Sequence, residues 1–428
     1  MKYDVVLFDL DGTLTRSAPG IINCARYAAQ EMGYPVADER VYEQFIGPPL
    51  HHSFTHLLGM TDAQADEAVR LYRVRFSSVG WMENAVYTGI PTLLRALKRQ
   101  GVRVAMATAK PFQFATRILD YFGLSRFFDA QIGITPEEKH AEKAEIVRKA
   151  LDALDFVPGE RAVMVGDRMY DIEGARANGI DAIGAAYGYG TREELEQAGA
   201  THIAADVDAL FTLLCGEDAQ MRGIFLSVEG LDGSGKTTQL EMLRKYLDER
   251  GYDVCYTREP GGSPIGEKIR ELLLDPANRE MTALTEAYLY AAQRAQHVSE
   301  VIRPALKAGR LVLGDRYVYA SAAFQGGGRQ LGVERVMALN EAAVQGVMPD
   351  ATLLFRVDTK VAMARRSAAS ALDRIEAEKE AFHQRVHDAY DALIGHEGAR
   401  FVCVDASGTM EETQKNACAA VDAVLSRI

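Results

Sequence analysis

The chain has 428 residues, more than a single hydrophobic core usually serves, so its length predicts two domains. A hydrophobic share of 48% and a charged share of 25% are typical of a globular protein, and the net charge of −12 argues against a basic surface for nucleic acid or anionic membrane. No apolar stretch is long enough to span a bilayer, no signal-peptide layout is visible, and the five cysteines are scattered. We therefore expect a cytoplasmic protein that binds neither nucleic acid nor membrane.

Short apolar runs alternate with helix-length amphipathic segments throughout the chain, which predicts parallel sheets covered by helices on both faces. In the first half the runs are at residues 5–9, 102–108, 161–167 and 181–186. In the second half they are at residues 224–230, 253–259, 311–316, 351–358 and 400–405. The predicted organisation is an α/β domain over 1–216 with a helical cap over about 15–85, a polar linker over 217–222, and an α/β domain over 223–428.

Two aspartates follow the first predicted strand, because "VVLFDLDGTLTRS" places Asp9 and Asp11 two residues apart in one loop. An aspartate with an ordinary pKa of about 3.9 is ionised at neutral pH, so Asp9 can attack phosphorus without a base. A nearby like charge raises the pKa of the second carboxyl, which then carries a proton to the leaving oxygen. Taken alone, the pair is better explained by two turn-forming aspartates.

Three later segments make a phosphatase site the better interpretation. "AMATAKP" ends a strand on Thr108, whose hydroxyl suits a phosphate oxygen. The segment "TPEEKHAEKAEIV" offers Lys139 or Lys143 as a fixed positive charge, with Lys143 at a helix start. "VMVGDRMYD" ends a strand on Asp167, with Asp171 four residues later, which suits metal ligation.

The motifs "FDLDGTL", "TAKP", "EKAEIV" and "GDRMYD" resemble those of the haloacid dehalogenase superfamily, in its phosphoglycolate phosphatase and 5′-nucleotidase-like group. The resemblance covers residues 1–216 and implies a Rossmann-like sheet with a helical cap. It implies Asp9 as nucleophile, Asp11 as acid/base, and Thr108 and Lys143 as phosphate binders. The candidate Mg²⁺ ligands are Asp9, Asp11, Asp167 and Asp171. We expect a phosphate ester as substrate, with a nucleoside monophosphate as the hypothesis and phosphoglycolate or another small ester as the alternative.

The second half opens with "GLDGSGKT" at residues 230–237, which fits G-x-x-x-x-G-K-[ST] between a predicted strand and helix. Glycines let backbone N–H groups turn toward phosphates, and the helix start favours negative charge. Lys236 would neutralise the β- and γ-phosphates, and Thr237 would ligate Mg²⁺. The predicted nucleoside triphosphate site comprises Gly230, Asp232, Gly233, Ser234, Gly235, Lys236, Thr237 and Thr238.

Later segments indicate a second nucleotide, the phosphate acceptor. "TREPGG" puts Arg258 at a strand end. "YLYAAQRAQH" puts Tyr290 and Arg294 on one helix face, where the ring can stack on a base and the guanidinium can reach its edge. "VLGDRYVYASAAFQGGGR" ends a strand on Asp315 and Arg316. It continues with Ser321, Phe324, Gln325 and a Gly326–Gly328 run that we expect to be flexible.

The motifs "FLSVEGLDGSGKTTQ", "TREPGG", "YAAQR", "GDRY", "AAFQGGGR" and "LDRIE" resemble those of thymidylate kinase over residues 222–428. The resemblance implies a P-loop parallel-sheet fold, ATP as donor, dTMP as acceptor, and a homodimer formed through this domain. It assigns the dTMP phosphate to Arg258 and Arg316, and stacking on thymine to Tyr290. The implied base and sugar contacts are Arg294 and Ser321 at the base edge, Gln325 nearby, and Phe324 where the family usually has tyrosine. The acidic candidates are Asp232 and Asp315 near Mg²⁺ and Glu376 on the acceptor side.

Transfer between two anionic nucleotides needs positive charge, but no base, because the attacking phosphate oxygen is already anionic. The resemblance implies an arginine in the phosphate loop or in a lid, and the loop here contains none. The lid candidate is "ARRSAASALDRIE" at 364–376, with Arg365, Arg366 and Arg374 as the expected cations. An alternative is that one half is a degenerate binding or regulatory module.

Overall fold

The computed structural model describes residues 3–34, 38–135, 142–216, 223–367 and 373–428, without the side chains of 366 and 367. The predicted linker 217–222 and Lys139 lie outside the described residues. The chain forms two compact units, Met1–Ala219 with Glu249–Gly251 and Gln220–Asp248 with Tyr252–Ile428. Among the described residues, no helix combines the length and the apolar character needed to cross a bilayer.

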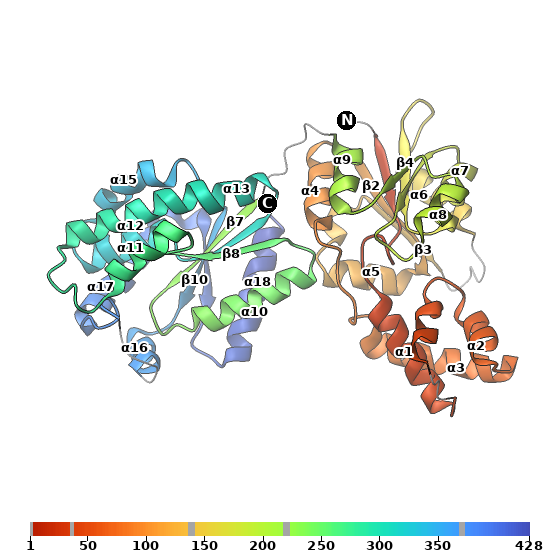
Figure 1. The fold of residues 1–428 in the computed structure, drawn as a ribbon, viewed down its shortest axis with the longest axis horizontal. Helices are drawn as coiled ribbons and strands as arrows, with labels where there is room; N and C mark the ends of the chain where they lie inside the picture. The colour runs from red at the N-terminus through yellow and green to blue at the C-terminus, as the bar shows by residue number, and fades with distance from the viewer. Residues whose placement is uncertain (1–2, 35–37, 136–141, 217–222, 368–372) are drawn as a thin grey trace. The chain divides into compact units, whose positions relative to one another are not determined.

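The N-terminal unit is built on a six-stranded parallel sheet in the order β3-β2-β1-β4-β5-β6, with helices on both faces (Figure 1). Its strands are β1 (Val5–Phe8), β2 (Arg103–Pro111), β3 (Ala130–Ile134), β4 (Ala162–Gly166), β5 (Asp181–Ala185) and β6 (His202–Ala204). β1 lies between β2 and β4, and the strand order changes direction there. The loop after β1 is therefore at a switch point, where open α/β sheets place their ligands.

Helices fill the predicted cap region, and α1, α2 and α3 lie together below the sheet in Figure 1. The cap elements are α1 (Ala18–Glu31), η1 (Glu39–Phe45), α2 (Leu50–Leu58), α3 (Asp62–Arg75) and the π-helical η2 (Phe76–Gly80). The remaining helices of the unit are α4 (Ile90–Arg99), α5 (Phe112–Tyr121), η3 (Ser125–Phe127), α6 (Lys143–Ala153), α7 (Met169–Ala177), α8 (Arg192–Ala198) and α9 (Val207–Cys215).

The C-terminal unit is built on a five-stranded parallel sheet in the order β11-β10-β7-β9-β8. Its strands are β7 (Ile224–Gly230), β8 (Val254–Arg258), β9 (Leu311–Asp315), β10 (Ala351–Arg356) and β11 (Phe401–Asp405). β7, buried along its whole length, lies between β10 and β9, so its carboxyl end is also a switch point. The predicted fold class, two parallel-sheet α/β domains, is confirmed.

Helices cover both faces of this second sheet (Figure 1). They are α10 (Lys236–Glu249), α11 (Pro264–Leu274), α12 (Ala283–His297), η4 (Val298–Ile302), α13 (Arg303–Lys307), α14 (Val318–Ser321), η5 (Ala322–Gly328), α15 (Val333–Val344), α16 (Thr359–Ser367), α17 (Glu380–Glu397), η6 (Gly398–Arg400) and α18 (Met410–Leu425).

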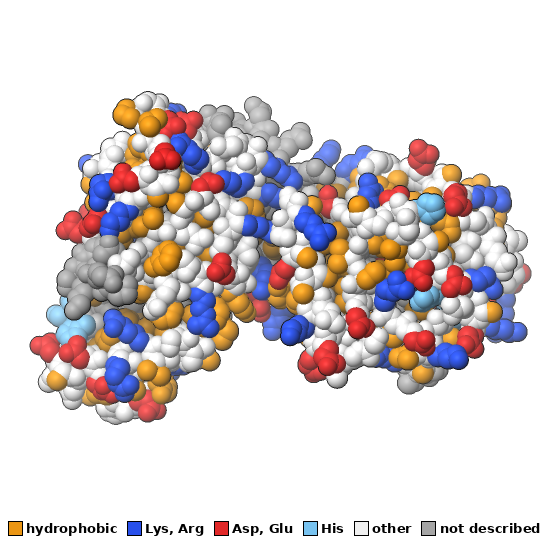
Figure 2. All heavy atoms as spheres, turned by 180° about the vertical axis from the view of Figure 1, so that it is seen from behind, with side chains coloured by type: hydrophobic (Ala, Val, Ile, Leu, Met, Phe, Trp, Pro, Cys, Tyr) orange, Lys and Arg blue, Asp and Glu red, His pale blue; other side chains and the backbone are white. Residues whose placement is uncertain are grey.

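Each unit has its own apolar core. Leu7 and Met164 are fully buried in the first, and Leu226 and Leu313 in the second. On the face drawn in Figure 2, acidic and basic side chains are interspersed over both units.

Two candidate active sites

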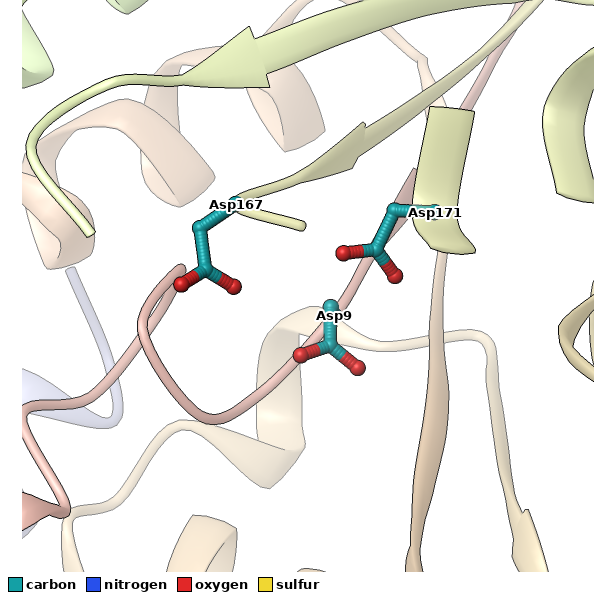
Figure 3. A group of neighbouring side chains, drawn as sticks. All are labelled: Asp9, Asp167 and Asp171. Carbon is teal, nitrogen blue, oxygen red and sulfur yellow. The ribbon is translucent and has the colours of Figure 1, made fainter. Parts of the chain in front are cut away.

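The first site is a cluster of buried carboxylates at the carboxyl edge of the N-terminal sheet. Asp9 follows β1, Asp167 follows β4, and Asp171 lies in the first turn of α7 (Figure 3). One carboxylate oxygen from each lies within 4.8 Å of the others. Carboxylate oxygens at this spacing are the ligands that Mg²⁺ prefers in proteins.

The electrostatics of the cluster also fit a cation. Burial raises the pKa of Asp9 to about 6, with Lys143 opposing the shift and Asp171 adding to it. Burial, with the charges of Asp171 and Asp9, raises the pKa of Asp167 to about 8. The positive charge nearby therefore does not fully compensate the negative charge of these carboxylates. A divalent cation would supply the missing positive charge.

Lys143 begins α6 and lies between two of these carboxylates. Its Nζ is 2.6 Å from Oδ1 of Asp9 and 2.6 Å from Oδ1 of Asp171. Although burial lowers the pKa of Lys143, the charges of Asp171 and Asp9 outweigh it and raise that pKa. Lys143 thus remains a fixed cation beside Asp9, whereas Lys139 lies outside the described residues.

Lys110 is a charged residue of this site that the sequence interpretation did not single out. Its Nζ donates to Oδ2 of Asp11 over 2.7 Å and lies 4.9 Å from the ring centroid of Phe76 in the cap. Oδ1 of Asp11 is buried and has no partner among the described residues. Thr108 is buried two residues before Lys110, and its Oγ1 accepts a hydrogen bond from the Lys110 N–H over 3.3 Å. The available signal was the lysine inside "TAKP".

The second site is a glycine-rich loop between β7 and α10. Gly230, Gly233 and Gly235 have φ of +138°, +84° and +85°, a region that glycine tolerates and side chains do not. Lys236 is buried, and its Nζ donates to the carbonyls of Gly230 at 3.0 Å and Leu231 at 2.7 Å. The loop and the helix start form a cradle that fits a polyphosphate. Ser234 is buried, Asp232 is half buried, and Thr237 and Thr238 are exposed.

Arg316 and Asp315 lie beside this cradle, at the end of β9. Arg316 donates to the Gly230 carbonyl over 3.0 Å and pairs with Asp232. Its guanidinium lies 4.7 Å from the ring centroid of Phe324. Oδ1 of Asp315 is buried and has no partner among the described residues, so it is suited to a cation at the cradle.

The predicted acceptor residues are spread over β8, α12, α14 and η5. Arg258, at the end of β8, is half exposed and pairs with Glu267 at 3.0 Å. Tyr290 is half buried on α12, and burial raises the pKa of its hydroxyl. Arg294, one turn further, donates to Ser321 Oγ over 3.1 Å. The structure thus brings Arg294 and Ser321 into contact.

Comparison with known proteins agrees with this geometry. Residues 228–417 match the thymidylate kinase family. The chain is 48% identical over 191 residues to a thymidylate kinase from Exiguobacterium sp., which covers 45% of this chain and 90% of that protein. The chain belongs to the thymidylate kinase family. A thymidylate kinase from Symbiobacterium thermophilum is 47% identical over 204 residues, covering 48% of this chain and 95% of that protein.

Residues 6–185 match the haloacid dehalogenase-like hydrolase family, so a hydrolase domain is fused to the thymidylate kinase domain. A crystal structure of a predicted phosphatase from Clostridium acetobutylicum is similar at 40% identity and a TM-score of 0.46, over 50% of this chain and 99% of that one. A haloacid dehalogenase-like hydrolase from Streptococcus pneumoniae is similar at 31% identity and a TM-score of 0.45, over 50% of this chain and 97% of that one.

The glycine run of the kinase domain is not the flexible loop that the sequence suggested. Gly326 and Gly328 are buried in the π-helical η5, where Gly326 faces the start of α15 and Gly328 faces α17. A Cβ at Gly327 would lie 2.5 Å from Cβ of Ala389, and one at Gly328 would lie 2.6 Å from the Phe382 ring. These glycines allow two helical segments to approach closely, and this is a packing role.

The lid arginines of the kinase domain differ in their surroundings. Arg365 donates to the carbonyl of Ala406 over 2.8 Å and more weakly to those of Ser407 and Gly408. The side chain of Arg366 lies outside the described residues. Arg374 is buried and pairs with Glu286 at 2.8 Å, so a phosphate would have to displace that carboxylate to reach it. Arg374 is therefore better explained as an internal ion-pair residue than as a lid cation.

A cavity of about 230 Å³ adjoins the phosphate loop on the lid side. Asp232 and Glu376 line it together with His383 and the apolar residues Leu231 and Met363. Glu376 thus lies near the phosphate loop, and its role on the acceptor side stays a prediction.

Proposed function

We propose that the kinase domain transfers the γ-phosphoryl group of ATP to dTMP. The observation that carries this proposal is the position of Arg316, which contacts both the phosphate loop and the Phe324 ring. In this proposal Arg316 serves a donor phosphate chain on the side of the phosphate loop and an acceptor phosphate on the side of Phe324.

In the proposed reaction an oxygen of the dTMP phosphate attacks the γ-phosphorus of ATP. The new P–O bond forms as the bond between the γ-phosphorus and the β–γ bridging oxygen breaks, giving dTDP and ADP. The attacking oxygen is already ionised, so the protein positions the two phosphates and compensates their charge. Lys236 serves the donor phosphates, and Arg258 and Arg316 serve the acceptor phosphate. Arg365 and Arg366 remain the candidates for additional charge.

Thr237 and Asp315 would hold Mg²⁺ at the kinase site, where the ion would screen the charge of the donor phosphates. The buried, unpartnered Oδ1 of Asp315 supports this assignment.

For the hydrolase domain we propose phosphate monoester hydrolysis through an aspartyl-phosphate. A carboxylate oxygen of Asp9 attacks phosphorus, and the bond to the leaving oxygen breaks as Asp11 gives that oxygen a proton. Asp11 then takes a proton from water, whose oxygen attacks phosphorus and releases phosphate and Asp9. Thr108 and Lys143 bind the phosphate oxygens. Asp9, Asp167 and Asp171 would hold Mg²⁺, which screens the approach of a carboxylate to a phosphate dianion.

We propose a nucleoside monophosphate as the hydrolase substrate, because the partner domain handles the same class of molecule. Phosphoglycolate or another small ester is the second candidate. A panel of phosphate esters tests this directly, and a strong preference for phosphoglycolate over every nucleotide would reject the nucleotide proposal.

One coupled experiment tests both activities in the full chain. ADP release with ATP and dTMP, and phosphate release from the ester panel, are measured for the wild type, Asp9→Ala and Lys236→Ala. We expect Asp9→Ala to abolish phosphate release only, and Lys236→Ala to abolish ADP release only. A wild-type chain that lacks one activity would instead support the alternative of a regulatory module in that half.

We also propose that the chain forms a homodimer through its kinase domain, in the cytoplasm. Four apolar side chains on α11 and α12 support this proposal because they are exposed: Ile265, Leu272, Leu284 and Tyr288. The cysteines are all free thiols, which suits a reducing compartment. Light scattering on Tyr288→Glu against wild type tests the interface, and a wild-type monomer would reject it.

A further inference from the structure

We propose that Glu259 is a positioning residue that sets the base specificity of the kinase domain by fixing the guanidinium of Arg294. The inference rests on the proposed transfer to dTMP and on the role that the family resemblance implies for Arg294, which is to read the edge of the acceptor base. Glu259 follows β8, one residue after Arg258.

Glu259 forms an ion pair with Arg294 inside the protein. Nε of Arg294 donates to Oε2 of Glu259 over 2.8 Å, and Nη2 lies 2.7 Å from the same oxygen. The side chains of both residues are at most 2% exposed. A buried charge pair of this kind has little freedom, because either partner alone would be an uncompensated charge.

Other groups hold the remaining faces of the guanidinium. Nη2 also donates to Ser321 Oγ at 3.1 Å and lies 3.2 Å from the Tyr317 carbonyl. Nη1 donates to Oδ1 of Asn340 on α15. Asn340 is the one partner of Nη1 among the described residues, and each Nη carries two N–H groups. One N–H of Nη1 therefore remains to meet a ligand.

Glu259 is itself held in place. Its Oε1 lies 2.9 Å from Nδ1 of His297, and Nε2 of that ring is 2.6 Å from Oγ1 of Thr257. The backbone N–H of Glu259 donates to the Asp315 carbonyl over 2.9 Å, which ties it to β9. Thr257, Glu259 and His297 are all buried. The network thus fixes the carboxylate before any nucleotide binds.

A fixed N–H donor discriminates between bases by their hydrogen-bonding groups. It matches a carbonyl oxygen, which thymine and uracil present where cytosine presents an amino group. A guanidinium that could rotate would lose this selectivity, because another orientation could avoid the amino group. Glu259 therefore acts on specificity without touching the base.

The test compares Glu259→Gln with wild type in the full chain. The assay measures kcat/KM for dTMP and dCMP, with dissociation constants from titration calorimetry where turnover is too slow. We expect the preference for dTMP over dCMP to fall by about tenfold or more, since hydrogen bonds to charged groups carry that discrimination. KM for ATP should change little. Glu271→Gln removes the same charge from an exposed position on α11 and should leave the preference unchanged.

Asn340→Leu removes a hydrogen-bond acceptor from the other side of the Arg294 guanidinium and keeps a similar side-chain volume. If Glu259→Gln does not fold, the dTMP preference of Asn340→Leu tests whether a fixed guanidinium is needed. If kcat/KM fell for both dTMP and dCMP while the ratio of the two values stayed unchanged, the role of Glu259 would be merely structural. That result would overturn the inference. Arg294→Met separates the two proposals. If Arg294→Met loses the preference while Glu259→Gln and Asn340→Leu keep it, the positioning role falls and the base-reading role stands. If Arg294→Met keeps the preference, the base-reading role falls as well.

Discussion

At the scale of single residues, Lys110 connects the chemistry of the hydrolase site to its cap. Its ammonium is 2.7 Å from Asp11 and packs on the Phe76 ring, with 8% of the side chain exposed. Nothing in the composition or spacing of "TAKP" tells which carboxylate the lysine meets, because the partner lies 99 residues earlier in the chain. Such a contact follows from the sheet order, which places β1 beside β2.

We predict that Lys110→Met lowers phosphatase kcat/KM by about tenfold or more, because Asp11 loses the charged partner that holds it near the leaving oxygen. Phosphate release from p-nitrophenyl phosphate measures the effect. Lys98→Met is the control, since Lys98 forms a comparable 2.6 Å pair with Asp129, which precedes β3 at the amino end of the strands, whereas the cluster lies at the carboxyl end. Equal activity of the Lys110 and Lys98 variants would contradict the role given to Lys110.

Glu229, just before the phosphate loop, predicts a pH dependence of stability. It is fully buried, accepts from Tyr317 N–H and Tyr390 OH, and burial raises its pKa to about 7. The folded state therefore holds the proton more tightly than the unfolded state, where the pKa is about 4.3. The stabilisation is complete below that value and is lost as the pH rises through 7, a loss of about 4 kcal/mol at most.

Glu229→Gln should remove this loss, because an amide can bond the same two groups without a charge. The measurement is the melting temperature of the kinase domain, which is identified as the transition that dTMP raises. Between pH 5 and pH 8 we expect this temperature to fall by several degrees less in the variant than in wild type. Glu241→Gln, at an exposed position on α10, should behave like wild type. If the melting temperatures of Glu229→Gln and wild type depended on pH in the same way, ionisation of the buried Glu229 carboxyl would not destabilise the folded state.

At the scale of elements, the sequence predicted all five strands of the second sheet and the central strands of the first, and it missed the two edge strands of the first sheet, β3 and β6. β1, β4 and β7 are buried along their whole length, so they read as continuous apolar runs. β3 is mostly half buried, and β6 has three residues, so neither carries a strong apolar run. Motif residues at strand ends were predictable for the same reason, because parallel strands deliver them to one edge.

The π-helical segment η5 could not be predicted from its glycines alone. A glycine run is compatible with a loop or with close packing, and the partner that decides is α17, far along the chain. The network around Arg294 was equally hidden, since Glu259, His297 and Asn340 come from three separate elements.

Close packing of η5 on α17 predicts opposite effects for two glycine substitutions. Gly327→Ala should destabilise the kinase domain by roughly 1–3 kcal/mol, because its Cβ would meet Ala389 at 2.5 Å. Gly395→Ala, in α17 itself, has no atom within 4 Å of the new Cβ and should stabilise by about 0.5–1 kcal/mol. Urea unfolding of the kinase domain, identified as the transition that dTMP shifts, measures both changes in the free energy of unfolding. A Gly327→Ala variant as stable as wild type would mean that η5 yields at this point.

At the scale of the whole molecule, two complete sites on two separate cores predict two unfolding events. Each unit has its own sheet and its own buried cluster, so each should melt as a cooperative unit. A ligand stabilises only the state that binds it, by an amount that grows with its concentration over its Kd. dTMP should therefore raise one melting temperature, and Mg²⁺ with a phosphate analogue such as vanadate should raise the other.

Differential scanning calorimetry of the full chain measures this prediction, with Asp167→Asn and Arg258→Ala as the ligand-blind controls. Asp167→Asn should abolish the Mg²⁺-vanadate shift and keep the dTMP shift, and Arg258→Ala should do the reverse. A single transition that moves as a whole with either ligand would show that the two units unfold together. In that case binding at one site would stabilise the other, and the two activities of this chain would be thermodynamically linked.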